Sequence, residues 1–357
     1  MQWVEVDPVD ADPAADPRTV HIGAHGRVIY RRWGRRQGIK RAASVGFRGR
    51  QPSAIRPVVD SPPGWQHRCV RISVIMPAFN EAAGIGGVLR RLLESPQFGA
   101  DMEVVVAANG CTDDTAAVAR SYGVRVLEIP TPSKAAAMNA AGQASKGDVL
   151  IYVDADVPVT AEVLRQLAAT VSRPGVVAAV PRPLVDTSGS AWPVRAYYAM
   201  NARLPVFRNR LFGRGVIALS AEARSRFDRI PEITADDMFL DAVVGADEKV
   251  EIEAVVRVRA PRRTGDLIRR VARAREGNAE FWRFVRSAPP EYGLPVDPVP
   301  GPSSWSWLRH VLLRSPRLLP AAACYVAIIL LAEARRRSPG WSVRSGWGRR
   351  EFPQLRR

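Results

Sequence analysis

Apolar residues alternate between short runs and helix-spaced stretches from residue 71 to residue 180. Residues 72–76 form a β-branched apolar run that Pro77 closes, which is typical of a buried strand. Apolar side chains then recur at helical spacing from Ile85 to Leu93, and Pro96 ends that helix. The same alternation predicts further strands at residues 104–108, 124–129, 149–153 and 176–180. It predicts helices at residues 113–121 and 133–145 and after Thr160.

Strands that alternate with helices in this way predict an α/β fold, with a mostly parallel sheet and helices on both of its faces. In such sheets ligands bind beyond the carboxyl ends of the strands. The residues that directly follow each predicted strand are therefore the first candidates for a functional site.

The two ends of the chain lack this alternation. Residues 1–70 show no sustained period and predict an irregular, basic extension. From residue 286 the chain is proline-rich, and an apolar stretch at residues 318–332 follows, with arginines on both sides. We therefore divide the chain into an extension (1–70), an α/β domain (71–285), and a linker with a basic, apolar C-terminal helical segment (286–357).

The apolar stretch at residues 318–332 is shorter than the roughly 20 residues that span a bilayer. A core helix and an interfacial helix both fit this length. Nearby tryptophans and arginines favour contact with a membrane interface.

The formal net charge is +17, and the two ends carry most of the excess. Residues 18–71 hold 13 Lys or Arg against one acid, and residues 335–357 hold 8 Arg against one acid. Such ends are either solvated extensions or contacts with an anionic membrane surface or another polyanion.

The chain has three cysteines and four histidines. The odd cysteine count, without a CxxC pair, argues against a disulfide framework or structural zinc and suits a reducing cytosol. The acid-rich start has no apolar leader, so we expect a cytoplasmic protein. Because every histidine lies outside the middle of the chain, acid–base chemistry there must fall to carboxylates.

Asp154 and Asp156 directly follow the predicted strand at residues 149–153. Two carboxylates this close need a cation, and their oxygens suit Mg²⁺ or Mn²⁺, which would in turn bind a diphosphate. A simple polar turn is the alternative. Lys134 lies ahead of the same strand, where it could meet phosphate or be an ordinary surface lysine.

Four motifs occur in a fixed order over roughly residues 71–245: "SVIMPAFNE", "ANGCTDDT", "SKAAAMNAA" and "VDAD". Together they resemble the inverting family 2 glycosyltransferases, which have the Rossmann-like GT-A fold and use a nucleoside-diphosphate sugar as donor. Taken one motif at a time, ordinary turn and helix-capping chemistry is the alternative reading.

The resemblance implies a role for each matching residue. Residues of the first two motifs would hold the nucleoside, and the DxD acids would face the ribose and the metal–diphosphate. The implied donor-binding residues are Pro77, Ala78, Glu81, Asn109, Asp113, Lys134 and Asp154, with Asp156 and Asp154 as metal ligands. The chain departs from the family where Ala108 and Asn109 replace two acids, which leaves the nucleotide base open.

Two later segments extend the resemblance. Residues 211–220 are similar to a Gly-rich acceptor-side segment, and "ITADD" is similar to a Glu-Asp motif whose second acid is the general base. This implies Asp237 as base with Asp236 beside it, and a helix N-cap pair is the alternative. The family's Gln-x-x-Arg-Trp motif is absent. Arg270 and Arg273, on one helical face, are candidates for the diphosphate unless they belong to a solvated basic helix.

The expected reaction is metal-assisted sugar transfer, with inversion, to a hydroxyl acceptor such as a lipid-linked or cell-envelope glycan. We expect it at the cytoplasmic face of a membrane. A nucleotidyltransferase that makes the sugar nucleotide is one alternative, but "PAFNEAAG" lacks the basic Gly-rich loop it needs. A polyanion-binding protein without enzymatic activity is the other. No nucleic-acid motif supports it, so we expect no specific nucleic-acid partner.

Overall fold

The structure is a computed structural model that describes residues 70–204, 207, 209–292, 294 and 316–338 and two short strands near the N-terminus. The chain divides into two units, Met1–Trp65 and Gln66–Arg357. In the first unit β1 (Val20–Ile22) pairs antiparallel with β2 (Val28–Tyr30), which the sequence pattern did not predict. The other residues of the predicted extension, the prolines of residues 295–302 and the tail beyond residue 338 lie outside the described residues.

A seven-stranded sheet forms the centre of the second unit, in the order β5-β4-β3-β6-β8-β7-β9. Neighbours from β5 to β6 are parallel, as are β7 and β9, whereas β8 runs antiparallel to β6 and β7. The predicted mostly parallel α/β sheet is thus confirmed. The strands are β3 (Ile72–Ala78), β4 (Met102–Asn109), β5 (Arg125–Ile129), β6 (Val149–Val153), β7 (Ala178–Asp186), β8 (Val216–Ser220) and β9 (Lys249–Arg259).

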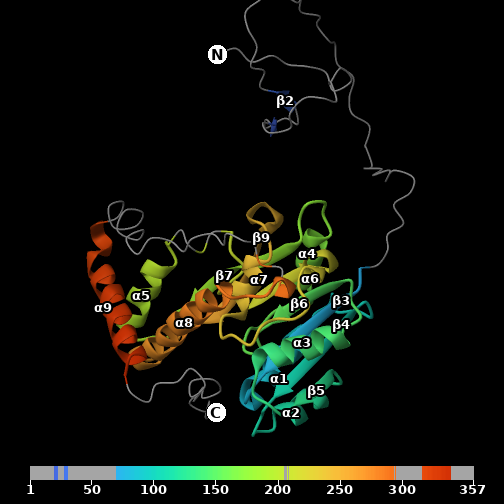
Figure 1. Cartoon of the computed structure of the whole chain (residues 1–357), viewed down its shortest axis with the longest axis horizontal. Coiled ribbons are helices and arrows are strands. Elements are labelled where there is room, and N and C mark those ends of the chain that lie inside the picture. Colours follow the sequence, from blue (N-terminus) through green and yellow to red (C-terminus); the bar gives the residue numbers. More distant parts are fainter. Residues whose placement is uncertain are drawn as a thin grey trace, which may run out of the picture. The chain divides into compact units, whose positions relative to one another are not determined.

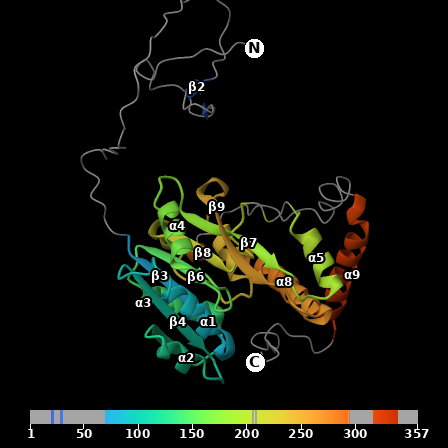
Figure 2. The same ribbon diagram turned by 180° about the vertical axis from the view of Figure 1, so that it is seen from behind.

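Helices cover both faces of this sheet, as predicted (Figures 1 and 2). On β3, Val74 and Met76 join the core on one face, and Ile75 joins the core on the other. Burial on both faces explains why these strands are continuous apolar runs. One face carries α1 (Ala82–Leu93), α2 (Thr115–Ser121) and α4 (Ala161–Val171). The other carries α3 (Lys134–Ala144), α6 (Ala221–Ser225), α7 (Asp236–Ala242) and the C-terminal part of α8 (Thr264–Val285).

A separate apolar cluster joins α5 (Trp192–Asn201), the N-terminal part of α8, and α9 (Leu319–Arg336). Tyr197 of α5 stacks on Tyr325 of α9 with ring centroids 5.0 Å apart. The apolar stretch at residues 318–332 is therefore helical and packed on one side. None of the helices within the described ranges is long and apolar enough to cross a membrane. Short 3₁₀ turns occur at Ala246–Glu248, Pro290–Tyr292 and Pro316–Leu318.

Candidate active site

The carboxyl ends of β3, β4 and β6 meet at one edge of the sheet, and the antiparallel β8 begins at that edge. Because Val153 pairs with Val216, the Gly-rich segment before β8 lies beside Asp154, whose backbone N–H donates to the Gly215 carbonyl at 2.9 Å. Gly215 has φ of 72°, and a Cβ there would lie 2.7 Å from Val157 Cγ2. Glycine is thus required at this position of the edge.

Lys134 joins the acid after β6 to the acid that starts α7. Its Nζ lies 3.0 Å from Asp154 Oδ1 and 2.9 Å from Asp236 Oδ2. Lys134 is the first residue of α3, whose N-terminus is fixed by Ser133 Oγ accepting from the Ala136 N–H. The structure therefore brings together three charged groups that are far apart in the sequence.

Asp237 lies next to this cluster, and its Oδ2 accepts a hydrogen bond of 2.8 Å from the Gly213 N–H. Burial, together with the negative charge of Asp236, raises the pKa of Asp237 to about 6. Burial also raises the pKa of Asp236. Burial alone would lower the pKa of Lys134, but the surrounding carboxylates raise it. A half-buried carboxyl that titrates close to neutral pH is suited to accept a proton from a hydroxyl group.

Two contacts fix the segment that leads into α7. Asn139 binds the backbone of Ile230 twice, as donor to the carbonyl (2.9 Å) and as acceptor from the N–H (2.8 Å). Glu280 of α8 accepts from the Thr234 N–H at 2.9 Å. Asn139 belongs to the motif that the sequence analysis singled out, and the structure shows it holding the chain just ahead of Asp236.

A buried ion pair fixes the other side of α7. Asp241 accepts from Lys249 Nζ at 2.9 Å and from the Leu211 N–H at 2.8 Å, and it also pairs with Arg210. These contacts tie α7 to β9 and to the Gly-rich segment that donates to Asp237. Sequence reasoning missed this pair. The available signal was Asp241 four residues after Asp237, which places both acids on one face of the helix.

Of the two arginine candidates on α8, Arg273 is the more buried. Burial and the nearby Arg270 charge lower the pKa of Arg273, and the charge of Asp154 opposes this shift, so Arg273 lies within electrostatic reach of Asp154. Arg270 is exposed and donates to the Arg259 carbonyl at 3.5 Å. Both lie in a helix, as the sequence pattern predicted.

At the ends of β3 and β4 three of the predicted nucleoside residues lie together and are buried. Pro77 and Ala78 are buried in β3. Asn109 is fully buried and donates from Nδ2 to the Ala78 carbonyl at 2.8 Å. Its Oδ1 makes no hydrogen bond within the described part of the chain. These residues join the two strand ends, and their contact with a nucleoside stays a prediction.

The loops that follow β3 and β4 are also clipped together. Asp113 accepts from the backbone N–H of Ala82 and of Thr115, both at 3.1 Å. The Glu81 N–H donates to Thr115 Oγ1 at 2.8 Å. Asp113 thus accepts from the first backbone N–H of both α1 and α2, and its contact with the nucleotide base stays a prediction.

Asp154 and Asp156 belong to a turn that the Val157 N–H closes onto the Asp154 carbonyl at 2.9 Å. The described residues contain no group of three or more His, Cys, Asp or Glu side chains that could hold a metal ion. Mg²⁺ often binds through one or two carboxylates together with substrate phosphates. Asp154 and Asp156 supply two carboxylates for such an arrangement, and metal binding by them stays a prediction.

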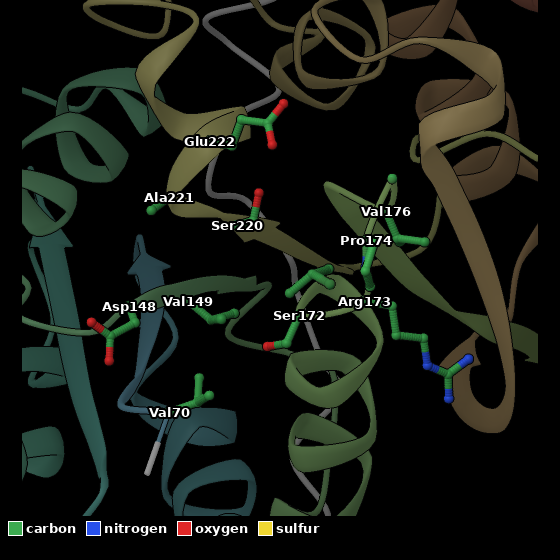
Figure 3. A pocket seen from close by; sticks show the side chains of 12 residues that line it. Val70, Asp148, Val149, Ser172, Arg173, Pro174, Val176, Ser220, Ala221 and Glu222 are labelled. Carbon is green, nitrogen blue, oxygen red and sulfur yellow. The ribbon is translucent and has the colours of Figure 1, made fainter. Parts of the chain in front are cut away.

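A cavity of about 370 Å³ lies at the other end of β6, away from these acids (Figure 3). It is lined by the starts of β3 and β6, the loop after α4 and the end of β8. Its charged side chains do not converge, since Asp148 accepts from the Arg71 N–H and Arg173 extends to a different side of the opening. The acid cluster is therefore the stronger candidate site.

Comparison with known proteins places part of the chain in a family of enzymes. Residues 73–221 match the family model "Glycosyl transferase family 2". Glycosyltransferase AglD of Haloferax volcanii is 31% identical over 126 residues, which cover 33% of this chain and 19% of that protein. Glucosyl-3-phosphoglycerate synthase of Mycolicibacterium paratuberculosis is 37% identical over 94 residues, or 24% of this chain and 28% of that protein. The chain thus spans less than a third of the length of either relative.

The fold is shared with a solved structure, the mannosyltransferase PcManGT from Pyrobaculum calidifontis in complex with GDP-Man and Mn²⁺. The two are 22% identical, and the match covers 74% of this chain and 78% of that one with a TM-score of 0.50. Sequence motifs, sheet topology and the family match agree, and residues 73–221 are therefore a glycosyl transferase family 2 domain with the GT-A-like fold that the motifs predicted.

Proposed function

We propose that this chain is a glycosyltransferase that moves a sugar from a nucleoside diphosphate to a hydroxyl acceptor, with metal assistance and inversion. The observation that carries the proposal is the bridge by Lys134 between Asp154 and Asp236. Asp154 belongs to the donor side of the site by its motif, and Asp236 and Asp237 belong to the acceptor side. The bridge supports the proposal, because one lysine contacts both the proposed donor-side acid and the proposed acceptor-side acid.

On the donor side, Asp154 and Asp156 would hold Mg²⁺ or Mn²⁺. When bound, such an ion offsets the negative charge of a departing diphosphate. Arg273 would add a second positive charge on the same side of the site. The proposal does not specify the nucleotide base of the donor, because Ala108 and Asn109 stand where acids are usual. Asn109 Oδ1 also accepts no hydrogen bond within the described chain.

On the acceptor side, Asp237 takes the proton from the acceptor hydroxyl while the hydroxyl oxygen forms the new bond to the sugar C1. The bond from C1 to the diphosphate oxygen breaks on the opposite face, so the configuration at C1 inverts. The Gly213 N–H holds one oxygen of Asp237 in place. Its pKa of about 6 leaves the carboxylate ionised at neutral pH and still basic enough to accept the proton.

We further propose that the acceptor is carried at the cytoplasmic face of a membrane, as a lipid-linked or cell-envelope glycan. The basic ends of the chain at residues 18–71 and 335–357 support contact with an anionic surface. An acceptor that is itself embedded in a membrane would require the enzyme to work there.

A thermal-shift screen of UDP, GDP, CDP and dTDP sugars, each with and without Mn²⁺, tests the donor proposal. We expect one nucleotide class to raise Tm only when the metal is present, and Asp156→Ala to abolish that shift. Asp247→Ala, which removes an exposed carboxylate outside the site, is the matched control and should keep the shift. A shift that needs no metal, or that survives in Asp156→Ala, would contradict the proposal.

A further inference from the structure

The outer face of α9 is an apolar stripe that no described part of the chain covers. Leu319, Leu330 and Leu331 are 56%, 64% and 53% exposed, the highest values among the large aliphatic side chains of the described residues. The full stripe consists of the exposed residues Leu319, Ala323, Ala327, Leu330, Leu331 and Ala334. Their spacing of three and four residues places them on one side of the helix.

The inner face of α9 is fixed to the protein. Ala322, Ile328 and Ala332 are buried, and Ile328 and Ala332 pack in the cluster formed with α5 and α8. Tyr325 stacks on Tyr197, and Cys324 Sγ donates to the Pro193 carbonyl at 3.5 Å. Because this side is packed against the protein, only the outer stripe of α9 can contact a partner.

The charges around the stripe have one sign. Arg317 lies at one end of α9, and Arg335 and Arg337 lie at the other, all three exposed. Glu333 is the one acid of the helix; it is 18% exposed and pairs with Arg275, with Arg336 and with Arg337. Trp192, next to Pro193 beside α9, is 56% exposed and adds an aromatic ring to the surroundings.

We infer that the outer stripe of α9 lies in the headgroup region of an anionic lipid bilayer, with its arginines against the lipid phosphates. An apolar helical face flanked by cations is the pattern of an interfacial helix, and each arginine near an anionic surface adds attraction. The inference deepens the proposed membrane location but does not depend on the donor chemistry.

A second copy of this chain fits the stripe less well. Antiparallel pairing of two α9 helices would set Arg317 of one copy against Arg335 and Arg337 of the other. Parallel pairing would set each arginine against its own counterpart. The stripe offers no exposed acid to offset either repulsion, whereas an anionic bilayer would attract all three exposed arginines.

Co-sedimentation of the full chain with lipid vesicles tests the inference. We expect binding to vesicles of phosphatidylcholine mixed with phosphatidylglycerol, and weaker binding to phosphatidylcholine alone. Leu330→Gln with Leu331→Gln should lower the partition coefficient about tenfold or more, because both leucines lose their transfer into lipid. The matched control is Leu184→Gln, which changes a leucine of β7 that is 46% exposed and should bind like the unchanged chain.

A second variant works in the opposite direction and guards against a folding defect. Ala327→Trp enlarges the centre of the stripe and should raise the partition coefficient several-fold. Equal binding by the double glutamine variant would show that the basic ends alone hold the lipid, and would overturn the inference. So would a dimer in light scattering that the double variant dissociates. The donor screen is run without lipid, so its failure would leave this result standing.

Discussion

The two halves of the α/β domain bury different kinds of polar residue. Up to residue 171, the buried polar side chains of the described chain are the uncharged Ser73, Asn109, Thr115 and Thr170. Beyond it, to residue 292, four of the five are charged: Arg214, Asp236, Asp241 and Lys249. The first half thus has a core set by apolar packing, and the second half is held together in part by buried charges.

Buried charges are costly unless they are paired and hydrogen-bonded, and they seldom stabilise a fold more than apolar residues would. Each of these four is paired, and two of them, Asp236 and Asp241, lie on α7 with Asp237. Arg214 pairs with Glu251 on β9, and Lys249 pairs with Asp241 on α7. The difference teaches that paired charges, and not apolar packing alone, hold α7 and the Gly-rich segment beside Asp237.

Asp237→Asn is the sharpest test of that interpretation. The amide keeps an oxygen for the Gly213 N–H but cannot take a proton, so we expect kcat to fall by about 10²–10⁴. Donor-induced thermal shifts should remain, since the donor side is unchanged. Asp247→Asn is the matched control and should keep the activity of the unchanged chain. Retention of more than a tenth of kcat in Asp237→Asn would remove Asp237 as the base.

The pH dependence of the same residue adds an independent readout. Because the pKa of Asp237 is about 6, the base becomes protonated as pH falls through that value. We expect kcat/KM to drop about tenfold per pH unit below it, rather than only below about 4 as for an ordinary aspartate. The raised pKa also means that the folded chain binds this proton more tightly. The contribution of Asp237 to the free energy of unfolding is therefore largest below about pH 4 and is lost as the pH rises to about 6. Asp237→Asn should lack this pH-dependent contribution.

The first half of the domain could also be predicted from the sequence more completely than the second half. Strands β3, β4 and β6 followed from continuous apolar runs, because both faces of the sheet are covered there. The sequence pattern missed β8, β9, α5 and α6. The alternation of residues 249–259 was typical of a half-buried strand and could have been found. The antiparallel direction of β8 could not, since it depends on the pairing of Val153 with Val216.

The site divides in the same way. Motif order placed Asp154, Asp237 and Lys134 near one another, and the structure brings them together. Motif order alone could not show that Lys134 contacts two acids, because that depends on side-chain distances between three elements. Nor could it show that Asp113 and Asn109 serve as clips between neighbouring loops and strand ends. The roles of these residues toward a nucleoside remain predictions.

Asp241→Asn should produce the largest loss of stability. It leaves Lys249 buried without its counter-charge, and breaking a buried pair in this way costs about 3–5 kcal/mol. Lys249→Met should cost less, because Asp241 keeps Arg210 and the Leu211 N–H. Urea unfolding of both single variants and the double variant gives the coupling energy directly. Additive losses would show that the pair does not hold α7 to β9.

Asp113→Ala carries the comparison into the first half, where we expect a smaller effect. The variant loses a capping acceptor shared by the Ala82 and Thr115 N–H groups, which should cost about 1 kcal/mol of stability. Asp113→Asn keeps one acceptor oxygen and should recover part of this loss.

The KM for the donor distinguishes a clip from a binding residue. If Asp113 only clips the loops together, KM for the donor stays near that of the unchanged chain in both variants. If it also contacts the nucleotide base, KM rises in Asp113→Asn as well, although its stability recovers. A rise in KM without loss of stability would show that the clip contributes little and that the first half, too, uses a charged group for binding rather than for folding.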